Sequence, residues 1–422
     1  MLWTQAGEFF PDITITPAST SSATGLLLGK LSGETAMDRL WSAPTLYDND
    51  DNSFIQLFEI TGLFHIQSVY GNAGGDSFNT SDYKDSGQNE NVWGNDIEVR
   101  RERLGIRSKF FHHWRLDTNF NIDVDGQDGI GGSTTFYKSL QDVGLTYAPS
   151  DQFNLGVGKR RILVSRDQEI ISTEIVTVER SFLSNLLSPG ELTGVWAFGK
   201  SAANTWRYDV GLFSNARVKE FAQAGDGGSL LTGKIGYDFA EQTGLHSCLT
   251  KLTYFHNTEP GYQDGKDDPN FLFLASPSFS DAVTLTNDIS QGRFGMITEF
   301  MYGCGFSGLA DQGADSLVRI SQPDLFGIAL TVTYFITDKL QAAYRSQLVS
   351  STDPDGIRVP ARYEQLATGD DEIGNTYTSQ YIGLNYYIYS RKLKLLGGVE
   401  YSHLGGGSYD GYTVMSGLRL MF

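Results

Sequence analysis

The feature that most constrains this chain is a period-two alternation of apolar and small or polar residues, repeated along most of its length. In the clearest case, between Leu325 and Ile336, one side of the segment is apolar. Its members are Phe326, Ile328, Leu330, Val332, Tyr334 and Ile336. Such alternation indicates β-strands with two unlike faces rather than helices.

Sixteen such segments follow one another, joined by connections that alternate strictly between short and long. We expect strands at 53–70, 95–111, 113–124, 134–148, 152–164, 191–200, 204–215, 229–240, 246–257, 279–289, 292–303, 325–336, 339–351, 376–389, 392–403 and 411–422. This alternation is typical of an up-and-down barrel with tight turns at one rim and long loops at the other. Each strand with its connection has about 23 residues, enough for the roughly 9–11 residues that cross a bilayer.

Aromatic residues gather beside the short connections, which favours a membrane barrel over a soluble β-sandwich with the same residues in its core. They are Phe110, Trp114, Tyr147, Phe153, Trp206, Tyr237, Phe239, Tyr334, Tyr386 and Phe422. No apolar run is long enough for a transmembrane helix. The predicted fold is therefore all-β: a transmembrane antiparallel up-and-down barrel of 16 strands over residues 53–422.

Residues 1–52 lack the alternation and form a separate N-terminal segment. It could be a periplasmic tail, carry a short helix around residues 36–40, or lie in the lumen. Its beginning shows no basic region followed by an apolar one, so no signal peptide is visible; export would require one removed before Met1.

The second strand carries a basic column on one face: Arg101, Arg103, Arg107 and Lys109. Each such charge facing lipid would cost about 2–4 kcal/mol near the bilayer midplane, so the column is expected to face the interior. Arg115 and Arg345 have the same inward parity. The net charge of −18 argues against nucleic acid as a partner.

Two interpretations of this column remain open. It could attract anions along a water-filled wall. Alternatively, inward carboxylates of neighbouring strands could balance it and give a transverse field with little selectivity. These carboxylates are Asp117, Asp142, Asp209, Asp238, Glu299 and Glu400.

The third long connection, residues 165–190, contains apolar residues that an extended outer loop would have no reason to expose. We expect it to fold into the lumen and narrow it. The alternative is a loop packed over the rim or against a neighbouring subunit.

Enzyme and metal motifs are incomplete. The stretch from Gly228 to Lys234 resembles a phosphate-binding loop but is followed by Ile235 where a hydroxyl is needed. The acidic stretch 123–128 misses the spacing of a calcium loop. No catalytic residue, metal or cofactor is predicted.

The chain resembles the phosphate-selective porin O and P family of bacterial outer-membrane channels. The motifs that carry the resemblance are RRERLGIRSKFF (100–111), LQDVGLTYAPSDQFNLGVGK (140–159), VERSFLSNLLSPGELTGV (178–195), LFGIALTVTYFITDKLQAAYR (325–345), YIGLNYYI (381–388) and the closing LRLMF. The lead-in DRLWSAPTLYDNDDNSFIQ (38–56) is similar to what precedes the barrel in distant members.

The resemblance implies a homotrimer in the outer membrane, with the third loop in the pore and both termini periplasmic. It places a constriction signature on Glu179, Arg180 and Ser181 and the pore-wall bases on the column already described. Lys159, followed by two arginines, stands where the family usually has glutamine.

The leading functional hypothesis is a general porin for passive diffusion of small hydrophilic solutes, with a mild preference for anions, phosphate among them. A largely closed barrel acting as an adhesin or structural surface protein is the alternative. A third reading, a barrel enzyme acting on lipid, requires a serine and a histidine in reach of each other at the lipid boundary.

Overall fold

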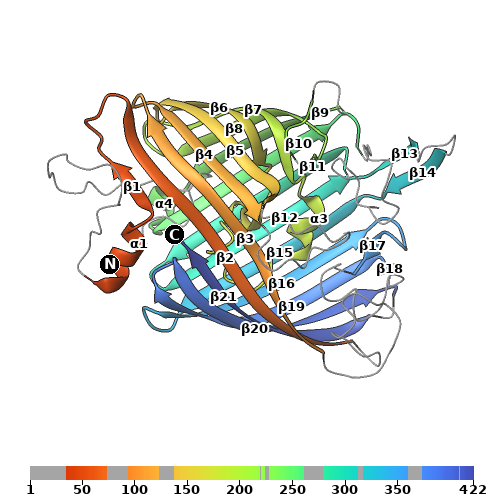
Figure 1. Ribbon diagram of the computed structural model, residues 1–422. Helices are drawn as coiled ribbons and strands as arrows, with labels where there is room; N and C mark the ends of the chain where they lie inside the picture. Colours follow the sequence, from red (N-terminus) through yellow and green to blue (C-terminus); the bar gives the residue numbers. More distant parts are fainter. Residues whose placement is uncertain are drawn as a thin grey trace.

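The computed structural model describes residues 35–73, 94–122, 137–218, 220–223, 228–260, 279–311, 317–359, 373–407 and 409–422. Sixteen strands form its wall (Figure 1). They are β2 (Ile55–Ala73), β3 (Gly94–Phe110), β4 (Trp114–Ile122), β5 (Tyr137–Ser150), β6 (Phe153–Arg161), β7 (Glu191–Lys200), β8 (Trp206–Ser214), β9 (Ser229–Asp238), β10 (Ser247–Asn257), β11 (Asp281–Gln291), β12 (Phe294–Cys304), β15 (Leu325–Phe335), β16 (Leu340–Ser351), β19 (Thr376–Tyr389), β20 (Leu393–Gly405) and β21 (Asp410–Met421).

Every wall strand pairs antiparallel with the next, and the last pairs with the first. The pairing of β2 with β21 runs from Leu63↔Met421 to Ala73↔Gly411 and closes the barrel. The predicted closed barrel of sixteen strands is confirmed, and each predicted strand end lies within three residues of the observed one.

Smaller elements outside the wall were not predicted. β13 (Phe306–Asp311) and β14 (Leu317–Gln322) form a hairpin, and β17 (Ile357–Arg358) pairs with β18 (Ile373–Gly374). Three short helices lie in connections: α2 (Arg166–Glu169), α3 (Phe182–Leu187) and α4 (Ala240–Thr243). Figure 1 shows β13, β14, β17 and β18 at the end opposite the short turns. No helix among the described residues is both long and apolar enough to cross a membrane.

The wall strands bury polar residues inside and expose apolar residues outside. On β6, Leu155 and Val157 are about half exposed, whereas Asn154, which directly precedes Leu155, is 7% exposed. On β9, Leu231 and Ile235 face outward, whereas Lys234 is buried. This is the reverse of a soluble protein and is the arrangement that lipid outside and water inside require.

A β-bulge in β3 shifts the alternation of inward and outward residues between Val99 and Arg101. The register between β2 and β3 runs from His65↔Arg101 directly to Ile66↔Val99, so Arg100 has no opposite partner. A bulge inserts one residue and so reverses the odd–even alternation beyond it, which turns Ile97 outward at 67% exposed. As a result Arg100 and Arg101 both reach Glu179 in the interior.

The described part of the N-terminal segment lies at the short-turn rim, where the barrel closes. Here α1 (Ala36–Ser42) donates a hydrogen bond from Trp41 Nε1 to the carbonyl of Met421 at 2.6 Å. Tyr389 donates to Asp38 at 2.5 Å. The following β1 (Thr45–Asp48) pairs with the part of β2 that extends beyond β21. Figure 1 places α1 and the C-terminus at the same end of the barrel.

Gly105 sits in the middle of the basic column because the strands approach closely there. A Cβ at this position would lie 1.9 Å from the backbone oxygen of Thr118. Gly105→Ala is therefore expected to lower the free energy of unfolding by about 1–3 kcal/mol through overpacking. The measurement is the temperature at which the folded band converts to the unfolded one in a detergent gel.

The matched control is Gly233→Ala on β9, where an added Cβ meets nothing within 4 Å. It should leave the conversion temperature almost unchanged. Equal conversion temperatures for the two variants would contradict the close approach at Gly105.

Candidate functional site

The long connection 162–190 lies against the inner faces of many wall strands, and its first anchor is an ionic cluster. The carboxylate of Glu169 contacts Lys234 on β9 at 2.6 Å and also Lys251 on β10. Arg166 contacts Asp288 on β11 at 2.6 Å. Burial alone raises the pKa of Glu169, but the charges of Lys234, Lys251 and Arg166 outweigh it and lower that pKa to about 2.

The second anchor is the segment 175–179, whose backbone carbonyls accept hydrogen bonds from wall side chains. Lys394 donates to the carbonyl of Ile175 at 2.7 Å, and Arg419 donates to the same oxygen at 2.9 Å. Arg345 donates to the carbonyl of Glu179 at 2.7 Å. β16, β20 and β21 thus hold this segment.

The third anchor is apolar. Leu183 and Leu187 of α3 are fully buried, and they pack over Gly327 of β15 and Gly303 of β12. Asp167 accepts from the backbone N–H of Ser181 and from the hydroxyl of Ser184, which joins α3 to α2. With three anchors, the connection covers the inner wall from β9 to β21, as Figure 1 shows for α3 inside the barrel.

Part of the inner wall from β2 to β5 stays exposed to solvent, and this wall carries the basic column. Arg107 contacts Glu59 at 3.2 Å and Asp117 at 3.1 Å, yet 34% of its side chain is exposed. Lys109 contacts Asp50 at 2.8 Å. Arg103 donates from Nε to Asn121 at 3.0 Å. Arg107 and Lys109 therefore have carboxylate partners, of which Asp117 is one of those expected, whereas this contact of Arg103 is with an amide.

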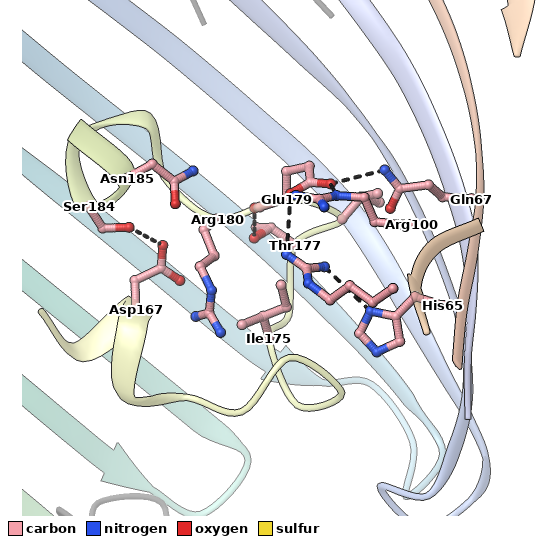
Figure 2. Close-up of polar contacts among 12 residues, drawn as sticks. His65, Gln67, Arg100, Asp167, Ile175, Thr177, Glu179, Arg180, Ser184 and Asn185 are labelled. Atoms are coloured by element: carbon pink, nitrogen blue, oxygen red, sulfur yellow. Dashed lines mark hydrogen bonds and ion pairs between the residues drawn. The ribbon is translucent and has the colours of Figure 1, made fainter. Parts of the chain in front are cut away.

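Where the connection approaches β3, charged groups gather more densely (Figure 2). Glu179 accepts from Arg100 Nε at 2.7 Å and from Gln67 at 3.0 Å, and lies 3.9 Å from Arg101. Arg101 in turn contacts Nδ1 of His65 at 3.4 Å. Glu179 thus joins the loop to both β2 and β3.

Arg180, the next residue, points away from this contact toward Asp167 and Ile175 in Figure 2. Its Nη2 donates to the carbonyl of Ile170 at 2.7 Å, while its Nε and Nη1 are buried without a hydrogen-bond partner in the structure. Burial lowers the pKa of Arg180 to about 10, although Asp167 acts to raise it. Two donors of a buried guanidinium are therefore available to a further acceptor.

The loop base supplies another charged pair. Arg161, at the end of β6, contacts Glu191 of β7 at 2.7 Å and reaches Gln168 of α2. Arg103 and Asp142 lie close enough to these groups to interact electrostatically. The candidate site, called the constriction cluster below, contains five guanidinium and three carboxyl groups. They are Arg100, Arg101, Arg103, Arg161 and Arg180 with Asp142, Glu179 and Glu191.

The structure places the remaining predicted site residues elsewhere. Arg115 lies opposite Lys109 on β4 and is half-buried. Ser181 is the N-cap of α3 and is buried. Arg345 is 2% exposed, because residues 175–179 cover it, so its environment differs from that expected of a pore-lining base.

Three members of the cluster were missed from the sequence: Arg100, Arg161 and Glu191. Strict alternation would turn Arg100 outward, whereas the bulge turns it inward. Arg161 was noted only as part of a departure from the family motif. Its neighbour Arg160 is held flat against the wall, contacting Asp209 at 2.7 Å with its guanidinium 4.6 Å from the ring centre of Trp196. Lys159 is buried and donates to two backbone carbonyls.

No group of three or more histidine, cysteine or acidic residues suited to a metal occurs within the described ranges. Cys248 and Cys304 are both free thiols.

Residues 69–230 match the family model "Phosphate-selective porin O and P", which confirms the predicted resemblance over this part of the chain. A search of curated proteins finds no match. The fold is shared with solved structures, of which three illustrate the likeness. The outer membrane channel DcaP of Acinetobacter baumannii is 14% identical with a TM-score of 0.51, covering 89% of this chain and 100% of that one.

Pseudomonas putida OprB is 11% identical with a TM-score of 0.51, covering 86% of this chain and 94% of that one. Salmonella typhi OmpF is 10% identical with a TM-score of 0.54, covering 90% and 100%. At these identities the likeness establishes the barrel fold and nothing finer.

Proposed function

We propose that this protein is an outer-membrane porin through which small hydrophilic solutes diffuse passively, with a mild preference for anions. The family match over residues 69–230 supports the channel class. The single observation that carries the anion preference is the excess of guanidinium over carboxyl groups in the constriction cluster. No chemical step on the solute is part of this proposal.

The preference is mild because the excess is small and partly compensated. Glu179 and Glu191 each accept from an arginine of the cluster, and Arg107 lies between two carboxylates. Field lines concentrate in a narrow passage with walls of low dielectric constant, so even a small excess of positive charge biases ion entry. Guanidinium groups also suit oxyanions by bidentate hydrogen bonding, so phosphate belongs to the proposed solutes.

The test is a planar-bilayer recording of the purified protein in a potassium chloride gradient. A reversal potential shifted from zero toward the equilibrium potential of chloride supports the proposal. Cation preference would contradict the anion preference, and absence of conductance would contradict the channel itself.

A largely closed barrel, serving as an adhesin or structural surface protein, is the second candidate. It is favoured by the extent to which residues 162–190 cover the inner wall from β9 to β21. Liposomes containing the protein distinguish the two, because they should swell in small sugars only if a passage remains.

A homotrimer is proposed on the resemblance to the porin family, whose match covers residues 69–230. We expect native mass spectrometry to give three times 46.5 kDa. A monomer mass in mild detergent would contradict the trimer.

The proposed orientation places the short-turn rim in the periplasm and the long connections outside the cell. The structural support is that α1 and the C-terminal strand meet at the short-turn rim through Trp41 and Met421. Protease added to intact cells should then cleave the long connections and spare α1.

A further inference from the structure

Three basic side chains on the covered wall have an unusual environment. Arg345 of β16, Lys394 of β20 and Arg419 of β21 are 2%, 0% and 2% exposed. All three lie beneath residues 175–179, which are called the strap below. None of the described strands pairs with the strap, and side chains of the wall hold its carbonyls.

The partners of these cations are mainly neutral backbone oxygens. Lys394 donates to Ile175, and Arg419 donates to the carbonyls of Ile175, Thr177 and Val178. Arg345 bonds to the carbonyl of Glu179. The covered wall thus binds the strap through at least five hydrogen bonds from three cationic groups.

Of the three cations, Arg345 alone has a carboxylate partner within 4 Å in the described part of the chain. Glu400 contacts it at 2.9 Å, whereas Glu174 contacts Arg391 at 2.9 Å and none of the three. Glu179 contacts Arg100. Within the described part of the chain, Lys394 and Arg419 have no carboxylate within 4 Å. Two cations are therefore buried with carbonyl dipoles in place of counter-ions.

A formal anion compensates a buried cation better than a carbonyl dipole does, because charge-assisted hydrogen bonds are shorter and stronger. An oxyanion with several acceptor oxygens could accept hydrogen bonds from the same donors that now bond to the strap carbonyls. The strap thus occupies the position of a ligand.

We propose that Arg345, Lys394 and Arg419 form a latent binding site for a multivalent oxyanion, which competes with the strap for these donors. The inference rests on the proposed function in one respect, that anions enter the lumen. When an oxyanion binds, the strap leaves the wall between β16 and β21 and widens the passage.

The anchors on either side of the strap make this displacement local. Glu169 is fixed by Lys234 and Lys251 before it, and Leu183 is buried against Gly327 after it. Neither anchor uses the three cations. The strap can therefore move while α2 and α3 keep their places.

The test measures access to the wall beneath the strap, without requiring conductance. Asn385 of β19 is fully buried and donates to the carbonyl of Val176 at 2.8 Å. The Asn385→Cys variant is made in a background with Cys248→Ser and Cys304→Ser, so that it carries one thiol. Its rate of modification by a charged thiol reagent is compared in potassium sulfate and potassium chloride at equal ionic strength.

We expect modification about tenfold faster in sulfate, because the anion shifts the population toward the displaced strap. Asn119→Cys, on the uncovered wall, is the matched control and should react equally in both salts. Adding Lys394→Gln to the Asn385→Cys variant should abolish the sulfate effect. If the protein with Lys394→Gln does not fold, Arg419→Gln is used in its place with the same expected result. Equal rates in the two salts for Asn385→Cys would overturn the latent site.

Failure of this inference is distinguishable from failure of the proposed function. If the protein conducts but shows no sulfate effect, the latent site is contradicted and the proposed porin function stands. If the sulfate effect is present but the protein does not conduct, the latent site stands and the porin function is contradicted.

Discussion

Arg103→Glu is expected to abolish the anion preference of the conductance. The substitution changes the constriction cluster from five cationic and three anionic groups to four of each. Two unit charges at the short distances of this cluster are worth about 1–2 kcal/mol at the dielectric of a wet passage, or roughly tenfold in the ratio of anion to cation permeability. The reversal potential in a potassium chloride gradient should move toward zero.

The control carries the same charge change away from the site. Arg39 lies exposed on α1 at the short-turn rim, so Arg39→Glu should leave the reversal potential nearly unchanged. Charge screening supports this, since the Debye length is about 10 Å at 0.1 M salt. Similar shifts in both variants would show that selectivity follows net charge rather than the constriction cluster.

Glu169→Gln is expected to be the most destabilising single change in the connection. It leaves the ammonium groups of Lys234 and Lys251 buried without their shared carboxylate. Removing one partner of a buried ion pair typically costs about 3–5 kcal/mol. We expect a lower conversion temperature in the detergent gel and faster proteolysis within residues 162–190.

Two further variants make the interpretation specific. Asp338→Asn breaks a pair with Arg293 in which the carboxylate is 94% exposed, and such pairs contribute little. Lys251→Met in the Glu169→Gln background should restore part of the loss, because the two residues share one cluster. An additive double variant would contradict the cluster.

The low pKa of Glu169 fixes the acid range over which this anchor holds. Its folded-state pKa of about 2 lies below the ordinary value of 4.5, so the anchor stabilises the fold fully above the ordinary value. That contribution decreases as the pH falls through the interval between the two values and is lost below about 2. Proteolysis within 162–190 should therefore be equal at pH 7 and pH 5.5, measured with a protease active at both. An increase at pH 5.5 would contradict the assignment.

Period-two alternation predicted the barrel because lipid and water impose opposite preferences on its two faces. The same parity placed Arg101, Arg103 and Arg107 on the inner wall. It could not place Arg100, because a single bulged residue reverses the parity of the strand from that point back toward Gly94 without a mark in the pattern. A prediction of inward and outward side chains from alternation alone therefore fails at bulges.

The environment of Arg345 depends on a different kind of information. Its inward parity was correct, but whether it meets water or protein depends on where residues 175–179 run. Apolar residues in the connection indicated that it would be buried, and not which side of the barrel it would cover. Long-range packing of a loop follows from the complementarity of two surfaces, which no local pattern records.

The strap contacts the wall through its main chain, and this determines how the protein will respond to sequence change. Exchanging Ile175, Val176 or Val178 for apolar residues of similar volume leaves every carbonyl in place, so a scan of this stretch would make it look expendable. The information that specifies the contact resides in the barrel, more than 150 residues later in the chain, at Arg345, Lys394 and Arg419. Comparison of related chains should therefore reveal variable side chains at residues 175–178 and conserved basic residues at positions 345, 394 and 419.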